Sequence, residues 1–110
     1  MIIAIDFDGT LVEHAYPKIG KEIPHAFETV EALKAKGHKL ILWTYRSGNL
    51  LQEAVDYCKE KGIIFDAVNA NFRDEKITDH NQRLIKADVY IDDRNVGGLP
   101  DWLEVKQKLG

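Results

Sequence analysis

Short hydrophobic runs alternate with amphipathic segments along this chain of 110 residues. The hydrophobic runs have the length of strands and contain many β-branched residues, whereas the amphipathic segments repeat their apolar positions at helical spacing. Strands are predicted at residues 2–5, 38–43, the second half of 63–68, and 88–91. Helices are predicted between Pro24 and Gly37, between an N-cap at Asn49 and Gly62, from Thr78 or Asp79 to Lys86, and over the stripe Trp102, Val105 and Leu109.

The regular alternation of strands and helices predicts an α/β fold. Helices between successive strands are the crossovers of parallel βαβ units, so the carboxyl ends of the strands are expected to share one edge of the sheet. Segment 11–23 has no helical period and is predicted to be a loop, with or without a small hairpin, over the end of the first strand. The length is that of one domain, predicted to span residues 1–110.

Composition narrows the class of protein without changing the predicted fold. Hydrophobic residues make up 45% and charged residues 30%, which is typical of a soluble globular domain. The formal net charge is −3 and no basic block is present, so nucleic acid is not indicated as a partner. No apolar stretch has the length of a membrane span, and the first apolar run lacks the basic flank of a signal peptide. We therefore expect a cytoplasmic protein that does not bind a membrane.

Polar residues follow every predicted strand and would meet at one edge of a parallel sheet. They are Asp6 and Asp8, Thr44 and Arg46, Asn69 and Asn71, and Asp92 and Asp93. Converging carboxylates repel one another unless a cation lies among them, and oxygen ligands without paired His or Cys favour Mg²⁺. The alternative is that each of these is an ordinary turn or cap residue.

Three short motifs make the chain resemble the haloacid dehalogenase (HAD) superfamily, in particular its small hydrolases without a cap domain. They are Asp6-Phe7-Asp8-Gly9-Thr10 directly after a buried strand, Thr44 at the end of another strand, and Asp92-Asp93 after a third. The resemblance covers the whole chain. It implies a three-layer Rossmann-like domain with a mainly parallel sheet in strand order 4-1-2-3, and a Mg²⁺-dependent phosphatase.

The resemblance also implies roles for the four carboxylates. Asp6 would be the nucleophile that forms an aspartyl phosphate, and Asp8 the acid and base that transfers protons. Mg²⁺ would be held by Asp6, the backbone carbonyl of Asp8, and Asp92. Asp93 would contact the ion through water or support a ligand.

Further residues would hold the phosphoryl group and the substrate. Thr44 would bind a phosphoryl oxygen through its hydroxyl and neighbouring N–H groups, with Tyr45 and Arg46 beside it. Thr10 would hydrogen-bond back and stabilise the turn after Asp6. The rim of the substrate site would include Asn69 and Asn71.

The superfamily also needs a cation near the phosphate, and the sequence offers three. Lys76 precedes a predicted helix on the correct edge of the sheet and is preferred. Lys86 precedes the fourth strand and would lie at the wrong edge, because about five strand residues span roughly 15–20 Å. Arg46 is the residue that would supplement or replace Lys76.

The expected site has no cap over it. Segments 11–23 and 69–77, where related proteins insert caps, are too short to form a domain. An open site suits a phosphate on a bulky substrate. Equally, a neighbouring copy in a homo-oligomer would cover the site for a small substrate. The sequence does not name the substrate.

Two other functions stay open at this point. One is a receiver-like phosphoacceptor, and the other is a non-catalytic domain that binds Mg²⁺ or phosphate. In a receiver, however, the acid pair and the phosphorylated Asp lie on different strands, whereas here both key acids are in one turn. Other conspicuous side chains, Trp43, Trp102 and Cys58, are predicted to pack in the core.

Overall fold

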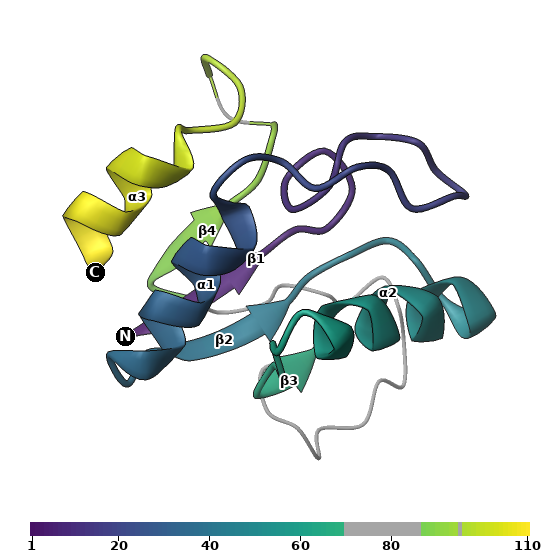
Figure 1. Cartoon of the computed structure of the whole chain (residues 1–110), viewed down its shortest axis with the longest axis horizontal. Helices are drawn as coiled ribbons and strands as arrows, with labels where there is room; N and C mark the ends of the chain where they lie inside the picture. Colours follow the sequence, from purple (N-terminus) through teal and green to yellow (C-terminus); the bar gives the residue numbers. More distant parts are fainter. Residues whose placement is uncertain (70–86, 95) are drawn as a thin grey trace.

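The computed structural model describes residues 1–69, 87–94 and 96–110 of the chain (Figure 1). Its strands are β1 (Ile2–Ile5), β2 (Lys39–Leu42), β3 (Ala67–Val68) and β4 (Val89–Ile91). Its helices are α1 (Ala26–Ala35), α2 (Gly48–Glu60) and α3 (Trp102–Leu109). The predicted alternation of strands and helices is therefore present, and the predicted helix at 78–86 lies outside the described residues.

The four described strands form one all-parallel sheet, which confirms the α/β class. The structure lists the strands in the order β3-β2-β1-β4, whereas the prediction listed them as 4-1-2-3. The two listings run from opposite edges of the sheet, and β1 lies between β2 and β4 in each. Ile5 pairs with Leu42 on one side and with Ile91 on the other, so the three strands end level with one another.

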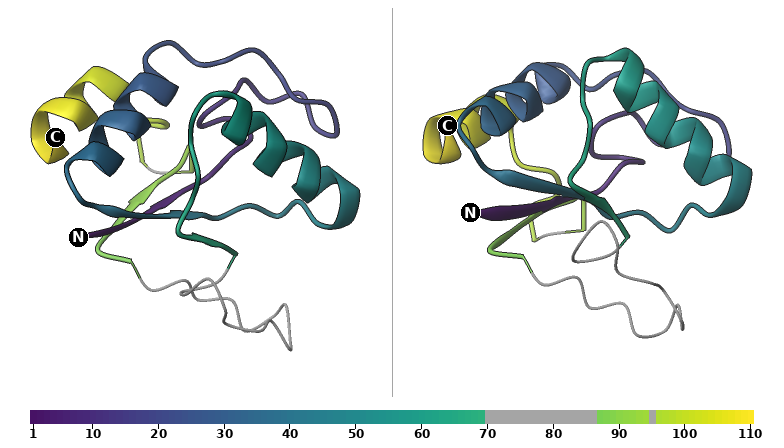
Figure 2. Two further views of the ribbon diagram at one scale, coloured as in Figure 1. Left: turned by 60° about the horizontal axis from the view of Figure 1, so that its bottom comes forward. Right: turned by 90° about the horizontal axis from the view of Figure 1, so that it is seen from below.

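The three described helices lie over one face of the sheet (Figure 2). Ile3, Ile5, Leu40 and Leu42 join these helices in one core cluster and are fully buried. Ala4, Ile41 and Ala67 form a second buried cluster on the alternate positions, which face the other side of the sheet. A third layer would depend on the helix predicted at 78–86, so the three-layer arrangement stays a prediction.

Both of the first two helices begin at other residues than predicted. Helix α1 starts at Ala26, because Pro24 lies in a turn and His25 takes a left-handed conformation with φ of 68°. Helix α2 starts at Gly48 with Ser47 in the N-cap position, two residues before the predicted cap at Asn49. Strand β3 is confirmed as the second half of its hydrophobic run.

The loop after β1 contains the small hairpin that the sequence left open. Val12 bridges Glu22 in antiparallel fashion, and the Glu13 N–H donates to the Lys21 carbonyl at 2.7 Å. This pairing folds residues 13–21 into a compact loop beside the carboxyl ends of the strands. No helix in the described residues is long and apolar enough to cross a membrane.

Candidate active site

A pocket of about 500 Å³ opens at the carboxyl edge of the sheet. Its walls come from the ends of all four strands and from the start of α2, and they are lined by Asp6, Trp43, Thr44, Tyr45, Arg46, Ser47, Gly48, Leu51, Asn69, Asp92 and Arg94. The structure therefore brings together Asp6, Thr44, Asn69 and Asp92, which the sequence placed at one edge.

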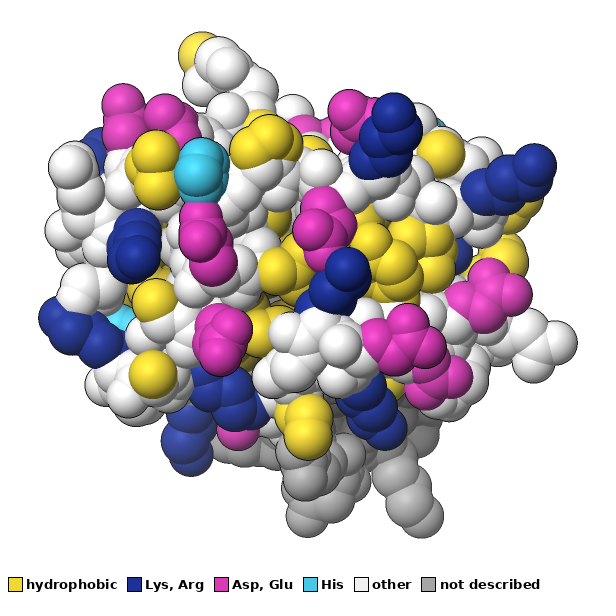
Figure 3. All heavy atoms as spheres, viewed as in Figure 1, with side chains coloured by type: hydrophobic (Ala, Val, Ile, Leu, Met, Phe, Trp, Pro, Cys, Tyr) yellow, Lys and Arg dark blue, Asp and Glu magenta, His cyan; other side chains and the backbone are white. Residues whose placement is uncertain are grey.

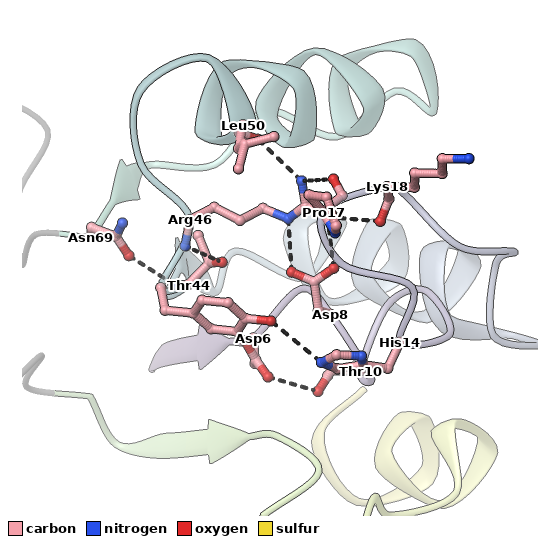
Figure 4. Close-up of polar contacts among 11 residues, drawn as sticks. Asp6, Asp8, Thr10, His14, Pro17, Lys18, Thr44, Arg46, Leu50 and Asn69 are labelled. Carbon is pink, nitrogen blue, oxygen red and sulfur yellow. Dashed lines mark hydrogen bonds and ion pairs between the residues drawn. The ribbon is translucent and has the colours of Figure 1, made fainter.

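Asp6 follows β1 directly and borders the pocket. Its N–H donates to the Ile91 carbonyl at 3.0 Å, which ties the end of β1 to β4. The Thr10 hydroxyl donates to the Asp6 carboxylate at 3.4 Å, the contact predicted for Thr10 (Figure 4). Partial burial, with the negative charges of Asp93 and Asp8, raises the pKa of Asp6 to about 6. The pKa of the Asp6 carboxyl group is thus close to neutral pH, and other acidic side chains lie nearby.

Gly9 allows Asp93 to approach this turn closely. The glycine has φ of +81°, and a Cβ at this position would lie 2.2 Å from Oδ2 of Asp93. Only a residue without a side chain fits both the backbone and the contact. Among the acids that raise the pKa of Asp6, Asp93 acts more strongly than Asp8. Asp93 therefore lies close enough to act on Asp6, although the resemblance implied only a supporting role for it.

Asp8 points away from Asp6 and toward Arg46 (Figure 4). Nε and Nη2 of Arg46 donate to the two carboxylate oxygens at 2.7 and 2.8 Å, and both side chains are fully buried. Burial of such a pair is tolerated because each charge is matched and hydrogen-bonded. The hydrogen bonding that Arg46 donates to Asp8 is the main reason that the pKa of Arg46 is raised.

The remaining donors of Arg46 bind backbone carbonyl groups. Nη1 donates to Pro17 and Leu50 at 3.3 Å each, and Nη2 donates to Lys18 at 3.0 Å. A guanidinium has five N–H donors, and here all five are used. Arg46 was predicted to contact phosphate, whereas the structure engages its guanidinium with Asp8, the 13–21 loop and α2.

Thr44 is held so that its hydroxyl can donate into the pocket. The Arg46 N–H donates to the Thr44 hydroxyl oxygen at 3.1 Å, which leaves the hydroxyl proton for another acceptor. Oδ1 of Asn69 accepts from the Thr44 N–H at 2.8 Å (Figure 4). Asn69 was predicted as substrate rim, and it also fixes the Thr44 backbone. Ser47 and Gly48 place the N-terminus of α2 on the same wall, where an anion is stabilised.

The donor set fits a hard divalent cation. Burial, and to a smaller extent the negative charges of Asp93 and Asp8, raise the pKa of Asp6, and a bound cation would stabilise the ionised carboxylate against both effects. Asp92 lines the pocket, and its Oδ1 accepts from the Arg94 N–H at 3.1 Å. In the described part of the chain, no three acidic, His or Cys side chains already form a cluster for an ion. Asp6 and the acids at 92 and 93 would therefore be joined by backbone carbonyl or water ligands.

Some predicted residues lie outside the described part of the chain, and some lining residues were not predicted. Asn71, Lys76 and Lys86 belong to the first group. Trp43 was predicted to pack in the core; it is partly buried against the second core cluster and also lies on the pocket wall, which was not predicted. Arg94 was not assigned a role, although its place directly after Asp92-Asp93 is the signal that could have identified it.

Comparison with known proteins gives one informative match. No family model matches the chain, and no curated protein matches it. Among solved structures, a conserved protein from Bacteroides thetaiotaomicron is 50% identical to the chain, with a TM-score of 0.89. The match covers 97% of this chain and 87% of that protein. The chain therefore belongs to the same family as this conserved Bacteroides thetaiotaomicron protein.

Proposed function

We propose that the protein is a Mg²⁺-dependent phosphatase of the HAD type that works through an aspartyl phosphate on Asp6. The observation that carries this proposal is the position of Asp6. It follows β1 directly and lines the same pocket as Thr44 and the N-terminus of α2. A carboxylate nucleophile thus lies beside groups that bind an anion.

The residues supply the steps of a two-stage transfer. An Asp6 oxygen attacks phosphorus, a new O–P bond forms, and the bond from phosphorus to the leaving oxygen breaks. Thr44 and the backbone N–H groups of Ser47 and Gly48 stabilise the phosphoryl oxygens. Water then attacks phosphorus, which releases phosphate and restores Asp6. Mg²⁺, when bound, offsets the negative charge of the phosphoryl group.

The resemblance assigns proton transfer to Asp8, and the structure adds a condition to this role. Both oxygens of Asp8 accept hydrogen bonds from Arg46, so neither is directed at the pocket. To protonate the leaving oxygen and later activate water, Asp8 must turn away from Arg46. In this proposal, the ion pair between Asp8 and Arg46 is the state of the site before substrate binds.

Phosphate release from a generic aryl phosphate tests this function. We expect turnover with Mg²⁺ and none with a chelator, and we expect Asp6→Asn to abolish it. Asp56→Asn is the matched control, because Asp56 is exposed on α2, accepts a hydrogen bond from Gln52 at 2.8 Å and does not line the pocket. Activity that survives in Asp6→Asn would rule out the mechanism.

The Asp8–Arg46 pair favours one second candidate. If Asp8 stays bound to Arg46, no group activates water, and the aspartyl phosphate would persist as in a receiver-like phosphoacceptor. Incubation with acetyl phosphate and Mg²⁺ separates the two functions. A phosphoprotein that lasts for minutes without turnover would support the phosphoacceptor. Binding of Mg²⁺ and phosphate without either reaction would indicate a non-catalytic domain.

A further inference from the structure

Two aromatic residues flank Thr44 in the sequence, and both line the pocket. Leu51 of α2 adds an aliphatic side chain to the same walls. We propose that the pocket takes a free, small phosphate monoester whose leaving group is a flat aromatic ring held against Trp43 and Tyr45. The proposal rests on the proposed phosphatase function, because it places the reacting phosphoryl group at Asp6 and Thr44.

Both aromatic rings are fixed by other aromatic side chains. Trp43 meets Tyr90 of β4 edge to face, with ring centroids 5.7 Å apart and planes at 67°. Tyr45 packs on Tyr16 of the 13–21 loop at 5.0 Å, and its hydroxyl lies 3.4 Å from Nε2 of His14. A ligand ring that packs on walls already held in place loses less binding free energy to side-chain ordering.

The exposure of these rings indicates a surface that a ligand would cover. Tyr45 is 52% exposed and Trp43 is partly exposed, although aromatic side chains gain most when they are buried. Aromatic pairs prefer offset-stacked or edge-to-face contacts, which a second flat ring can make and a flexible polyol cannot. The walls therefore select the shape of the leaving group.

The size and charge of the pocket favour a small molecule over a macromolecule. A volume of about 500 Å³ lies within the usual range for small-ligand sites, roughly 300–1,000 Å³. Arg94 contributes a guanidinium group, which can stack on an aromatic ring as well as bind an anionic substituent. On the described face seen in Figure 3, acidic and basic side chains are interspersed, without the basic area that a polyanion would need.

Two phosphonates test the proposal, because their C–P bonds resist hydrolysis and binding is measured without turnover. We expect benzylphosphonate to bind about tenfold more tightly than propylphosphonate in calorimetry with Mg²⁺. Trp43→Ala and Tyr45→Ala should each reduce this ratio to about twofold. Trp43→Phe and Tyr45→Phe keep a flat ring and should retain it, and their unfolding midpoints control for folding.

Each outcome bears on a different claim. Equal affinity for the two phosphonates in a protein that releases phosphate would overturn the aromatic leaving group and leave the phosphatase function standing. A phosphoserine peptide that binds more tightly than benzylphosphonate would also overturn the proposal. If neither phosphonate binds and no phosphate is released, the phosphatase function fails and the proposal fails with it.

Discussion

Asp6 is the residue whose ionisation links stability to function. Its pKa rises from 3.8 to about 6 on folding, mainly through burial, with Asp93 and Asp8 adding to the shift. The folded protein therefore binds this proton more tightly than the unfolded chain does. The stabilising contribution is fully present below about pH 4 and is lost as the pH rises through about 6. At neutral pH, ionised Asp6 destabilises the folded state.

We expect Asp6→Asn to increase the free energy of unfolding at neutral pH by about 1–2 kcal/mol, because the amide carries no buried charge. The difference from the parent protein should shrink toward zero near pH 4. Urea unfolding at both pH values measures it, in buffer without Mg²⁺, since a cation would offset the charge. A variant that is less stable than the parent at both pH values would contradict the assigned pKa.

At the scale of elements, Arg46 joins three segments that are distant in the sequence. Its guanidinium binds Asp8 after β1, the carbonyl groups of Pro17 and Lys18 in the 13–21 loop, and the Leu50 carbonyl in α2. It also lies 5.2 Å from the ring centroids of Phe7 and Tyr16. One buried side chain therefore ties the 13–21 loop to the turn after β1 and to α2.

Arg46→Gln should destabilise the protein by about 3–5 kcal/mol, because it leaves Asp8 as an unpaired buried charge. Arg46→Lys keeps the charge but not the fork of donors, so it should recover only part of the loss. Urea unfolding measures both variants. Lys61→Gln breaks the exposed ion pair with Glu22 and should leave the midpoint unchanged. An Arg46→Gln protein as stable as the parent would show that the buried pair contributes little.

The hydrophobic pattern predicted the elements well because it reflects burial directly. The run at 2–5 became β1 residue for residue, because a buried strand must be apolar on both faces. The run at 88–91 became β4 from Val89 on, although Tyr90 in it is 43% exposed. The hydrophobic pattern could not predict that Arg46 pairs with Asp8, which lies 38 positions away. Contacts of that kind depend on the path of the loops, which local pattern does not encode.

The assignment of Trp43 to the core was incomplete for a related physical reason, because Trp43 packs against the second core cluster and also lines the pocket. An aromatic residue at the end of an apolar strand has the same sequence signature whether it packs in the core or lines a pocket. Only the arrangement of α2 and β4 around it decides, and here it leaves part of the ring exposed. The predicted meeting of Asp6, Thr44 and Asp92 was correct because it needed only the parallel sheet.

Across the whole molecule, the last helix supports the turn that follows the first strand. Nε1 of Trp102 in α3 donates to the Thr10 carbonyl at 3.0 Å. The Thr29 hydroxyl of α1 donates to the Trp102 carbonyl at 3.3 Å. Trp102 is 2% exposed, so the predicted core role is confirmed. Residues at opposite ends of the chain thus fix the loop that contains Gly9 and Thr10.

Trp102→Phe should cost about 2–3 kcal/mol, because it leaves a gap and an unpaired buried carbonyl at Thr10. Since that loop carries Asp8, we expect kcat for phosphate release to fall several-fold with a smaller change in KM. Leu103→Ala, on the exposed side of α3, should cost less than about 1 kcal/mol and leave both constants unchanged. Unchanged kcat in a folded Trp102→Phe protein would show that α3 does not position the turn.

The shortness of the outer strands has a consequence for how the protein behaves at high concentration. Within residues 1–69, 87–94 and 96–110, the sheet ends in β3, with two residues, and in β4, with three. An exposed strand edge is a template on which a second chain can add a strand, and the length of the edge sets how many hydrogen bonds that addition gains. Edges this short offer few of them. The long, regular strand pairing that leads to fibrils is therefore disfavoured by the geometry of the native sheet itself.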